Sequence, residues 1–126
     1  MKITPVLVVE NIEKSLAFWI DRMGFNKTVE VPDRDRLGFV ILARDGAELM
    51  LQTRESVRKD IPEFAPASDH APAHLFIEVA DFADALKRLE GYPIMLTERT
   101  TFYGMREIGV FEPGGHAVIF AAPAHQ

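Results

Sequence analysis

The stretch TPVLVVENIEKSL at residues 4–16 recurs as HLFIEVADFADAL at residues 74–86, and no gap is needed to superpose the two. Each copy begins with an apolar run, continues with Asn11 or Asp81, and ends in a segment whose apolar residues recur at helical spacing. Asn and Asp are preferred at helix N-caps because their side chains accept hydrogen bonds from free backbone N–H groups. Each copy therefore predicts a strand followed by a capped helix, and the chain contains an internal repeat.

A second pair of segments also superposes without a gap: FVILARDGAELML at residues 39–51 and IGVFEPGGHAVIF at residues 108–120. Each has two apolar runs joined by a glycine-containing turn, which is typical of a β-hairpin. The two helices are expected at about residues 12–23 and 82–89, each followed by a glycine that is typical of a helix end. Two halves of this kind predict an α+β protein with mostly antiparallel strand pairing.

The composition is that of an ordinary globular protein. The chain has 126 residues and no cysteine, which allows one hydrophobic core and excludes a disulfide framework and thiolate chemistry. Its net charge of −5 disfavours nucleic acid as a partner, because phosphate binding needs a basic surface. No apolar run approaches the ~18 residues of a membrane span, and the first residues do not resemble a signal peptide. We therefore expect a cytoplasmic protein without a membrane partner.

A connecting segment separates the two halves of the repeat. We expect a single domain over residues 1–126, with a first module at about residues 1–53, a crossover at about residues 54–73 and a second module at about residues 74–122. The crossover has three prolines, mixed charge and little periodicity, so it is predicted to connect the modules. A stretch of this length is either ordered on the surface or functional, and the sequence leaves both possibilities open.

Strand side chains alternate between the two faces of a sheet, so one face of each predicted sheet packs on its helix and the other is free to line a cleft. The residues that this alternation assigns to the cleft face are Thr4, Val6, Val8, Glu48, Met50 and Gln52 in the first half, and His74, Phe76, Glu78, Ala117 and Ile119 in the second.

The two ends of the chain resemble a known family. TPVLVVENIEKSLAFWIDRMGF at residues 4–25 and GMREIGVFEPGGHAVIF at residues 104–120 are similar to segments of the vicinal-oxygen-chelate superfamily. That superfamily includes glyoxalase I, extradiol dioxygenases and bleomycin-resistance proteins, and the Phe-Trp pair at residues 18–19 is closest to the last group. The resemblance covers nearly the whole chain. It implies two βαβββ modules that form an incomplete barrel around a cleft, usually in a homodimer.

The resemblance also identifies the positions at which relatives bind metal. Metal-dependent members hold a divalent ion with two side chains from each module, typically His or Gln on the first strand and Glu on the last. The matching residues here are Thr4, Met50, His74 and Ile119. Only His74 is a competent ligand for Zn, Ni, Mn or Fe, whereas such a site needs about three protein ligands. We therefore predict no metal and no cofactor, and we interpret His74 as a cleft-wall residue.

A cleft without a metal favours binding over catalysis. The predicted function is that of a non-catalytic small-molecule-binding protein of the bleomycin-resistance (antibiotic-resistance) type, which sequesters a ligand such as a cationic drug in a dimer cleft. In drug-binding members, the loop after the first helix carries aromatic residues that stack on the ligand. Val31 and Arg36 stand there instead, with Phe39 as the nearest ring, so small-molecule binding in general is better supported than bleomycin binding. The predicted ligand-binding cleft consists of Thr4, Phe39, Glu48, Met50, His74, Phe76, Glu78, Phe102, Tyr103, Met105 and Ile119.

The alternative function is that of a glyoxalase-like lyase or isomerase. It would use a degenerate metal site, in which Glu48, Gln52 or Glu78 completes the ligands around His74. It could instead use a His74–Glu78 acid–base pair, because a carboxylate can orient an imidazole and raise its pKa. The serines lack a nucleophile-elbow sequence. The remaining histidines, His70, His116 and His125, are predicted in loops, a turn or the tail. Whether the chain is an enzyme is left open, with the binding protein favoured.

Overall fold

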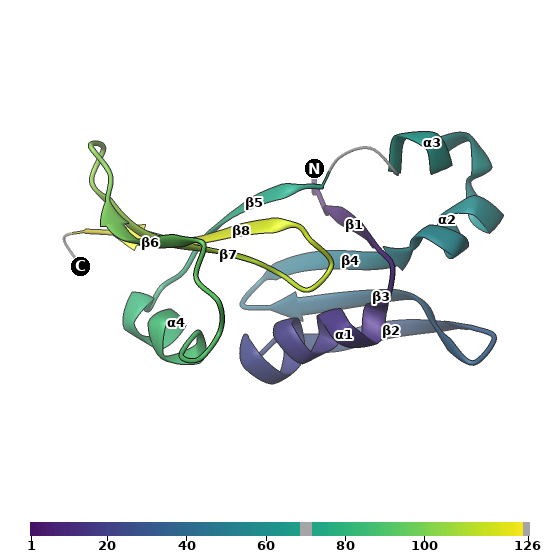
Figure 1. Cartoon of the computed structure of the whole chain (residues 1–126), viewed down its shortest axis with the longest axis horizontal. Helices are drawn as coiled ribbons and strands as arrows, with labels where there is room; N and C mark the ends of the chain where they lie inside the picture. The colour runs from purple at the N-terminus through teal and green to yellow at the C-terminus, as the bar shows by residue number, and fades with distance from the viewer. Residues whose placement is uncertain (69–71, 125–126) are drawn as a thin grey trace. The chain divides into compact units, whose positions relative to one another are not determined.

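The computed structural model describes residues 1–68 and 72–124, and His70 and His125 lie outside these ranges. It contains two four-stranded mixed sheets with helices, which confirms the predicted α+β class (Figure 1). The chain divides into two compact units, Met1–Pro72 and Ala73–Gln126, each with one sheet. The organisation as a single domain with the module boundaries given above stays a prediction.

The first unit has the strand order β1-β4-β3-β2, in which β1 runs parallel to β4 and the other pairs are antiparallel. Its elements are β1 (Val6–Val9), α1 (Ile12–Leu16), the π-helix η1 (Ala17–Arg22), β2 (Asn26–Asp33), β3 (Arg36–Arg44), β4 (Ala47–Thr53), α2 (Arg54–Asp60), the 3₁₀-helix η2 (Pro62–Phe64) and α3 (Ala65–Ser68).

The second unit repeats this topology with the strand order β5-β8-β7-β6, in which β5 runs parallel to β8. Its elements are β5 (His74–Glu78), α4 (Phe82–Arg88), β6 (Leu96–Thr100), β7 (Met105–Phe111) and β8 (Ala117–Pro123). None of the described helices in either unit is long and apolar enough to cross a membrane.

The sequence repeat holds at the level of strand register. In the first unit Val6 is the partner of Met50, and in the second unit Phe76 is the partner of Ile119. The gapless superposition places Val6 on Phe76 and Met50 on Ile119, so equivalent residues pair in equivalent ways. The equivalence of the two modules therefore extends from the order of the elements to the pairing of the parallel strands.

Both predicted helix caps are confirmed. The backbone N–H of Lys14 donates to Asn11 Oδ1 over 3.0 Å, and the backbone N–H of Asp84 donates to Asp81 Oδ1 over 3.0 Å. Each bond satisfies one of the backbone donors that the first turn of a helix leaves free. The helix at residues 82–89 has the expected extent, since α4 ends at Arg88 and Leu89 forms its C-cap.

The first helix differs from the prediction of one continuous α-helix at residues 12–23. Only residues 12–16 are α-helical, and residues 17–22 widen into a π-helix, with Met23 N–H donating to Phe18 O over 2.9 Å. Neighbouring residues of an α-helix point about 100° apart. The wider turn lets Phe18 and Trp19 both enter the core, where their rings pack edge-to-face with centroids 5.0 Å apart.

The core of the first unit lies between its sheet and the α1–η1 helix, which covers one sheet face in Figure 1. On β1, Leu7 and Val9 are fully buried while Val6 is 47% exposed, as the predicted alternation requires. The other face of this sheet is left open at partly exposed residues. The buried side chains of this layer are Leu7, Val9, Ile12, Phe18, Trp19, Met23, Val40, Leu42, Leu49 and Leu51.

The crossover contains more regular structure than its sequence indicated. Helix α2 follows β4 without a break, and Thr53 caps it by accepting a bond from the Ser56 N–H over 3.1 Å. Pro62 then opens η2, because a residue without an N–H fits the first turn of a helix but not its interior. Periodicity missed α2 because it buries only Val57, which is too little for a recognisable apolar stripe.

Removing either helix cap should destabilise the fold by a similar amount. Asn11→Ala and Asp81→Ala should each lower the free energy of unfolding by about 1 kcal/mol, because each leaves a backbone N–H without its acceptor. Urea denaturation measures this change. Lys87→Ala is the control, since Lys87 is exposed on α4, and it should change the value by less than about 0.5 kcal/mol. Unchanged midpoints in both cap variants would contradict the assigned caps.

Candidate functional site

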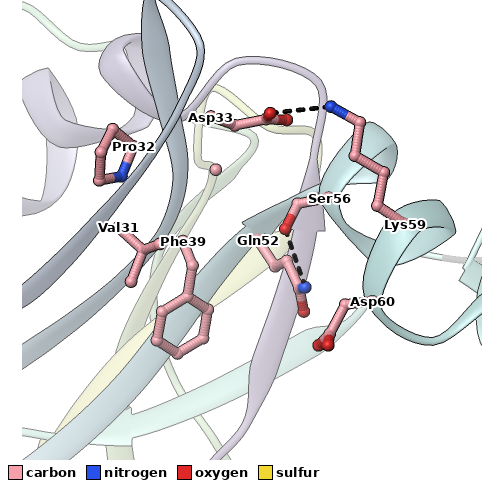
Figure 2. A pocket seen from close by; sticks show the side chains of 9 residues that line it. Val31, Pro32, Asp33, Phe39, Gln52, Ser56, Lys59 and Asp60 are labelled. Atoms are coloured by element: carbon pink, nitrogen blue, oxygen red, sulfur yellow. Dashed lines mark hydrogen bonds and ion pairs between the residues drawn. The ribbon is translucent and has the colours of Figure 1, made fainter.

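A hollow of about 490 Å³ lies in the first unit where the open face of the sheet meets α2. We call it the α2 pocket, and Figure 2 shows its walls. It is lined by Val31, Pro32, Asp33, Gly38, Phe39, Gln52, Ser56, Lys59 and Asp60.

Strand register and helix spacing bring these side chains together. Val31 of β2 is the partner of Phe39 of β3, and Phe39 is the partner of Gln52 of β4, so the three lie in one row across the sheet. Cross-strand partners present their side chains on the same face. Because α2 begins directly after β4, Ser56 and Asp60, which are four residues apart, extend this row along one side of the helix.

Gly38 allows the end of the β2–β3 hairpin to approach α2 closely. A Cβ atom at this position would lie 2.9 Å from the Cβ of Asp33 and 3.5 Å from the Cβ of Ser56. The first distance is shorter than real side chains tolerate, so any larger residue would push Asp33 away. The glycine therefore sets the width of the α2 pocket at its charged end.

Gln52 is held in one orientation on the pocket wall. It is only 8% exposed, and its Nε2 donates to Ser56 Oγ over 3.1 Å. Figure 2 shows its amide oxygen on the opposite side, toward Asp60. Buried amide groups usually have hydrogen-bond partners for both atoms. The oxygen of Gln52 has none among the described residues, so it is an available acceptor.

An ion pair closes the pocket at the hairpin end. Lys59 Nζ lies 2.8 Å from Asp33 Oδ1. The hydrogen bond from Lys59 holds the pKa of Asp33 below its usual value of 3.8, and the same bond raises the pKa of Lys59 above its usual 10.5. The second oxygen of Asp33 is buried and has no hydrogen-bond partner within the described part of the chain. A buried acceptor without a partner is unfavourable. The ion pair with Lys59 therefore holds the Asp33 side chain in place although one of its oxygens lacks a hydrogen bond.

Arg36 does not contribute its charge to the α2 pocket. Its guanidinium lies 3.3 Å from Glu55 Oε2 and also donates to the backbone oxygen of Glu10. Glu55 in turn lies 3.5 Å from Lys59, so this arginine belongs to an ion-pair network on the outside of α2. A neighbouring carboxylate therefore offsets the positive charge of Arg36.

The predicted cleft residues lie in both units. In the first unit, Phe39 lines the α2 pocket, and Glu48 and Met50 lie on the same face of β4 as Gln52. Thr4 precedes β1. That the residues of the two units line one cleft stays a prediction.

In the second unit, His74, Phe76 and Glu78 share the exposed face of β5, and Ile119 of β8 is the partner of Phe76. Met105 begins β7. Phe102 and Tyr103 lie between β6 and β7, where they pack edge-to-face at 5.1 Å. A smaller hollow of about 250 Å³ is lined there by Arg99, Thr100, Thr101, Phe102 and Tyr103.

The strand geometry separates the residues of the alternative acid–base pair. His74 and Glu78 stand four positions apart on β5, which corresponds to about 13 Å in an extended strand. Neither side chain forms a hydrogen bond or ion pair with the other residues that the structure describes. The histidine that is well integrated in this unit is His116, which is 6% exposed and whose Nδ1 accepts a bond from Ala73 N–H over 2.7 Å.

The donor chemistry does not fit a divalent ion at the positions that bind metal in relatives. Thr4, Met50 and Ile119 offer a neutral hydroxyl, a thioether and a hydrocarbon, which are poor or impossible ligands for Zn, Ni, Mn or Fe. Among the described residues, no three His, Asp or Glu side chains gather in a way that could hold an ion. We therefore derive no chemical step through a metal.

Sequence reasoning missed most of the polar side of the α2 pocket. The residues not foreseen as pocket residues are Pro32, Asp33, Gly38, Ser56, Lys59 and Asp60. The signal for Ser56, Lys59 and Asp60 was present in TRES at residues 53–56, where Thr53 can cap a helix and an acidic residue follows in its first turn. Asp33 and Gly38 carried no such signal, since their proximity depends on the hairpin register.

Two open mixed sheets, each with a parallel first and last strand and a helix on one face, define a protein of the paired βαβββ class. Residues 3–120 match the model of the Glyoxalase/Bleomycin resistance protein/Dioxygenase superfamily. The chain belongs to this superfamily. No curated protein sequence matches it.

Solved structures with the same fold have different functions. TioX from Micromonospora sp. ML1 has a TM-score of 0.79 at 16% identity, covering 98% of this chain and 99% of that one. A bleomycin-binding protein complexed with bleomycin has a TM-score of 0.65 at 18% identity, covering 97% and 98%. Lactoylglutathione lyase from Agrobacterium tumefaciens has a TM-score of 0.72 at 17% identity, covering 96% and 92%. At these identities the likeness shows the fold alone.

The Asp33–Lys59 pair should stabilise the protein only within a window of pH. Its Asp33 part is present above the usual carboxyl pKa and is lost as the pH falls through the lowered pKa of Asp33. Its Lys59 part is present below the usual pKa of lysine and is lost as the pH rises through the raised pKa of Lys59. Lys59→Gln should therefore lower the midpoint of thermal unfolding between about pH 5 and 9.

The difference between this variant and the wild type should shrink as the pH falls through the lowered pKa of Asp33, because protonation removes the charge with which Lys59 pairs. Lys87→Gln, on the exposed side of α4, is the control and should show no such pH-dependent difference. A difference between Lys59→Gln and the wild type that is equal at pH 7 and pH 2 would contradict the role of the ion pair.

Proposed function

We propose that this protein is a non-catalytic small-molecule-binding protein of the bleomycin-resistance type, which holds its ligand without a metal ion. The observation that carries the proposal is the α2 pocket, a hollow of about 490 Å³ with the ring of Phe39 and the buried amide of Gln52 on its wall. Small-molecule sites are typically hollows of roughly 300–1,000 Å³ that combine an apolar wall with a few fixed polar groups. The α2 pocket has both features.

The side chains of the α2 pocket are suited to binding more than to reaction. The hydroxyl of Ser56 is hydrogen-bonded to a neutral amide, which cannot remove its proton as a general base would. Asp33 is engaged by Lys59, and its lowered pKa makes it a weak base. The bleomycin-binding protein of the same fold supports a binding role.

The remaining parts of the proposal concern the assembly and its setting. We propose a homodimer in which the predicted cleft residues complete the binding site, and sedimentation equilibrium tests this oligomeric state. A cytoplasmic location and a role in antibiotic resistance belong to the same proposal. Susceptibility of cells with and without the gene to bleomycin-type drugs tests the second of these.

Ligand binding should depend on the apolar wall of the α2 pocket. Bleomycin and a panel of aromatic fragments should include a probe that shifts the backbone amide resonances of Gly38 and Ser56 in nuclear magnetic resonance spectra. Val31→Ala should weaken that probe by about twofold to fivefold, because it removes apolar contact area. Val29→Ala is the matched control, since Val29 is also exposed on β2 but lies outside the α2 pocket. A panel without any pocket-directed probe would refute the proposed function.

Binding should not require a transition metal. Protein purified without chelator should contain far less than one equivalent of Zn, Ni, Mn or Fe, because three of the four inherited positions cannot ligate. Elemental analysis measures the content, and His74→Ala should leave it unchanged. A stoichiometric metal that is lost in His74→Ala would instead support the lyase or isomerase alternative.

A further inference from the structure

On the α2 side of the pocket, the oxygen of Gln52 and the carboxylate of Asp60 are acceptors without a hydrogen-bond donor among the described residues. Gln52 directs its only donor group to Ser56, which leaves its oxygen facing the side of Asp60 (Figure 2). Asp60 is exposed at the end of α2 and forms no hydrogen bond or ion pair with the other described residues. A carboxylate and an amide oxygen on one wall cannot bond to each other, so both need a donor from outside.

The charge of this wall also favours a cationic donor. Lys59 is the one cation of the α2 pocket, and its ammonium is held by Asp33 and lies 3.5 Å from Glu55. The carboxylate of Asp60 has no such compensation among the described residues. A ligand carboxylate would meet Asp60 with repulsion and would find the ammonium of Lys59 already paired.

We propose that the α2 pocket selects aromatic ligands that carry a cationic N–H donor, such as an amidinium, a guanidinium or a protonated primary amine. The N–H groups would donate to the oxygen of Gln52 and to Asp60, while the ring packs against Phe39. This inference rests on the proposed function and deepens it by naming the class of ligand.

The requirement for N–H groups separates this proposal from simple attraction of positive charge. A quaternary ammonium carries the charge but cannot donate to the oxygen of Gln52, which is 8% exposed and cannot be reached by bulk water as freely as Asp60 can. A neutral amide can donate to it but gains nothing from the charge of Asp60. Hydrogen bonds between charged groups are stronger than neutral ones, so an amidinium should satisfy both acceptors best.

Four small probes with one ring each test the proposal: benzamidine, benzamide, benzyltrimethylammonium and benzoate. Dissociation constants come from titrations that follow the amide resonances of Gly38 and Ser56. Benzamidine should bind about tenfold more tightly than benzamide or benzyltrimethylammonium, and benzoate should bind most weakly.

Two charge-matched variants locate the effect. Asp60→Asn should reduce the affinity for benzamidine about tenfold, to the level of benzamide, and should leave the affinity for benzamide unchanged. Asp21→Asn makes the same change in net charge on η1, outside the α2 pocket, and should leave all four affinities unchanged. Equal losses in the two variants would overturn the proposal, because they would show a general effect of net charge.

The failure of this inference can be told apart from the failure of the proposed function. If benzamide or benzoate shifts the pocket resonances and benzamidine binds no more tightly, the pocket binds small molecules but lacks the preference. That result is also expected if Gln52 turns its amide over, since its Nε2 would then face Asp60 and supply the donor. If neither these probes nor the wider panel shifts the pocket resonances, both conclusions fall together.

Discussion

The parallel pairing of the first strand with the last strand of each unit is the constraint on which the other features depend. Once Val6 is the partner of Met50, the two-residue period of a strand assigns every side chain of β1 and β4 to a face. Leu7 and Leu51 then face the helix and form the core, while Val6 and Met50 stay on the open face. A shift of one residue would reverse this assignment and bury the polar members of the open face.

The α2 pocket follows from this constraint at the end of β4. Gln52 is the last open-face residue of the strand, and α2 begins two residues later at Arg54. The helix is short and buries little, so ion pairs to the β2–β3 hairpin contribute to its placement, with Lys59 on Asp33 and Arg36 on Glu55. Exposed ion pairs are individually weak, but here they join two elements that Gly38 already allows to approach closely. The result is a polar strand end beside the apolar side chains of Val31, Phe39 and Met50.

The sequence predicted those parts of the structure that local pattern determines. Strand alternation and both helix caps were predicted correctly, because each depends on residues close together in the chain. The π-helix was not predicted, since it depends on how Phe18 and Trp19 fit a core that the sequence does not display. The polar side of the α2 pocket was not predicted for a related reason. Asp33 reaches Lys59 across 26 residues of chain, and no periodic pattern reports such a contact.

The location of polar groups distinguishes this chain from metal-dependent members of its superfamily. The resemblance assigns the metal ligands on the last strand of each module to Met50 and Ile119, which are apolar here. An apolar strand centre supplies contact area but little selectivity, because hydrophobic burial has no directional preference. In the proposed binding role, selectivity would come from fixed acceptors at the end of β4, where Gln52 is oriented by Ser56. Recognition of this kind relies on hydrogen bonds and charge at the strand end and requires no metal ion.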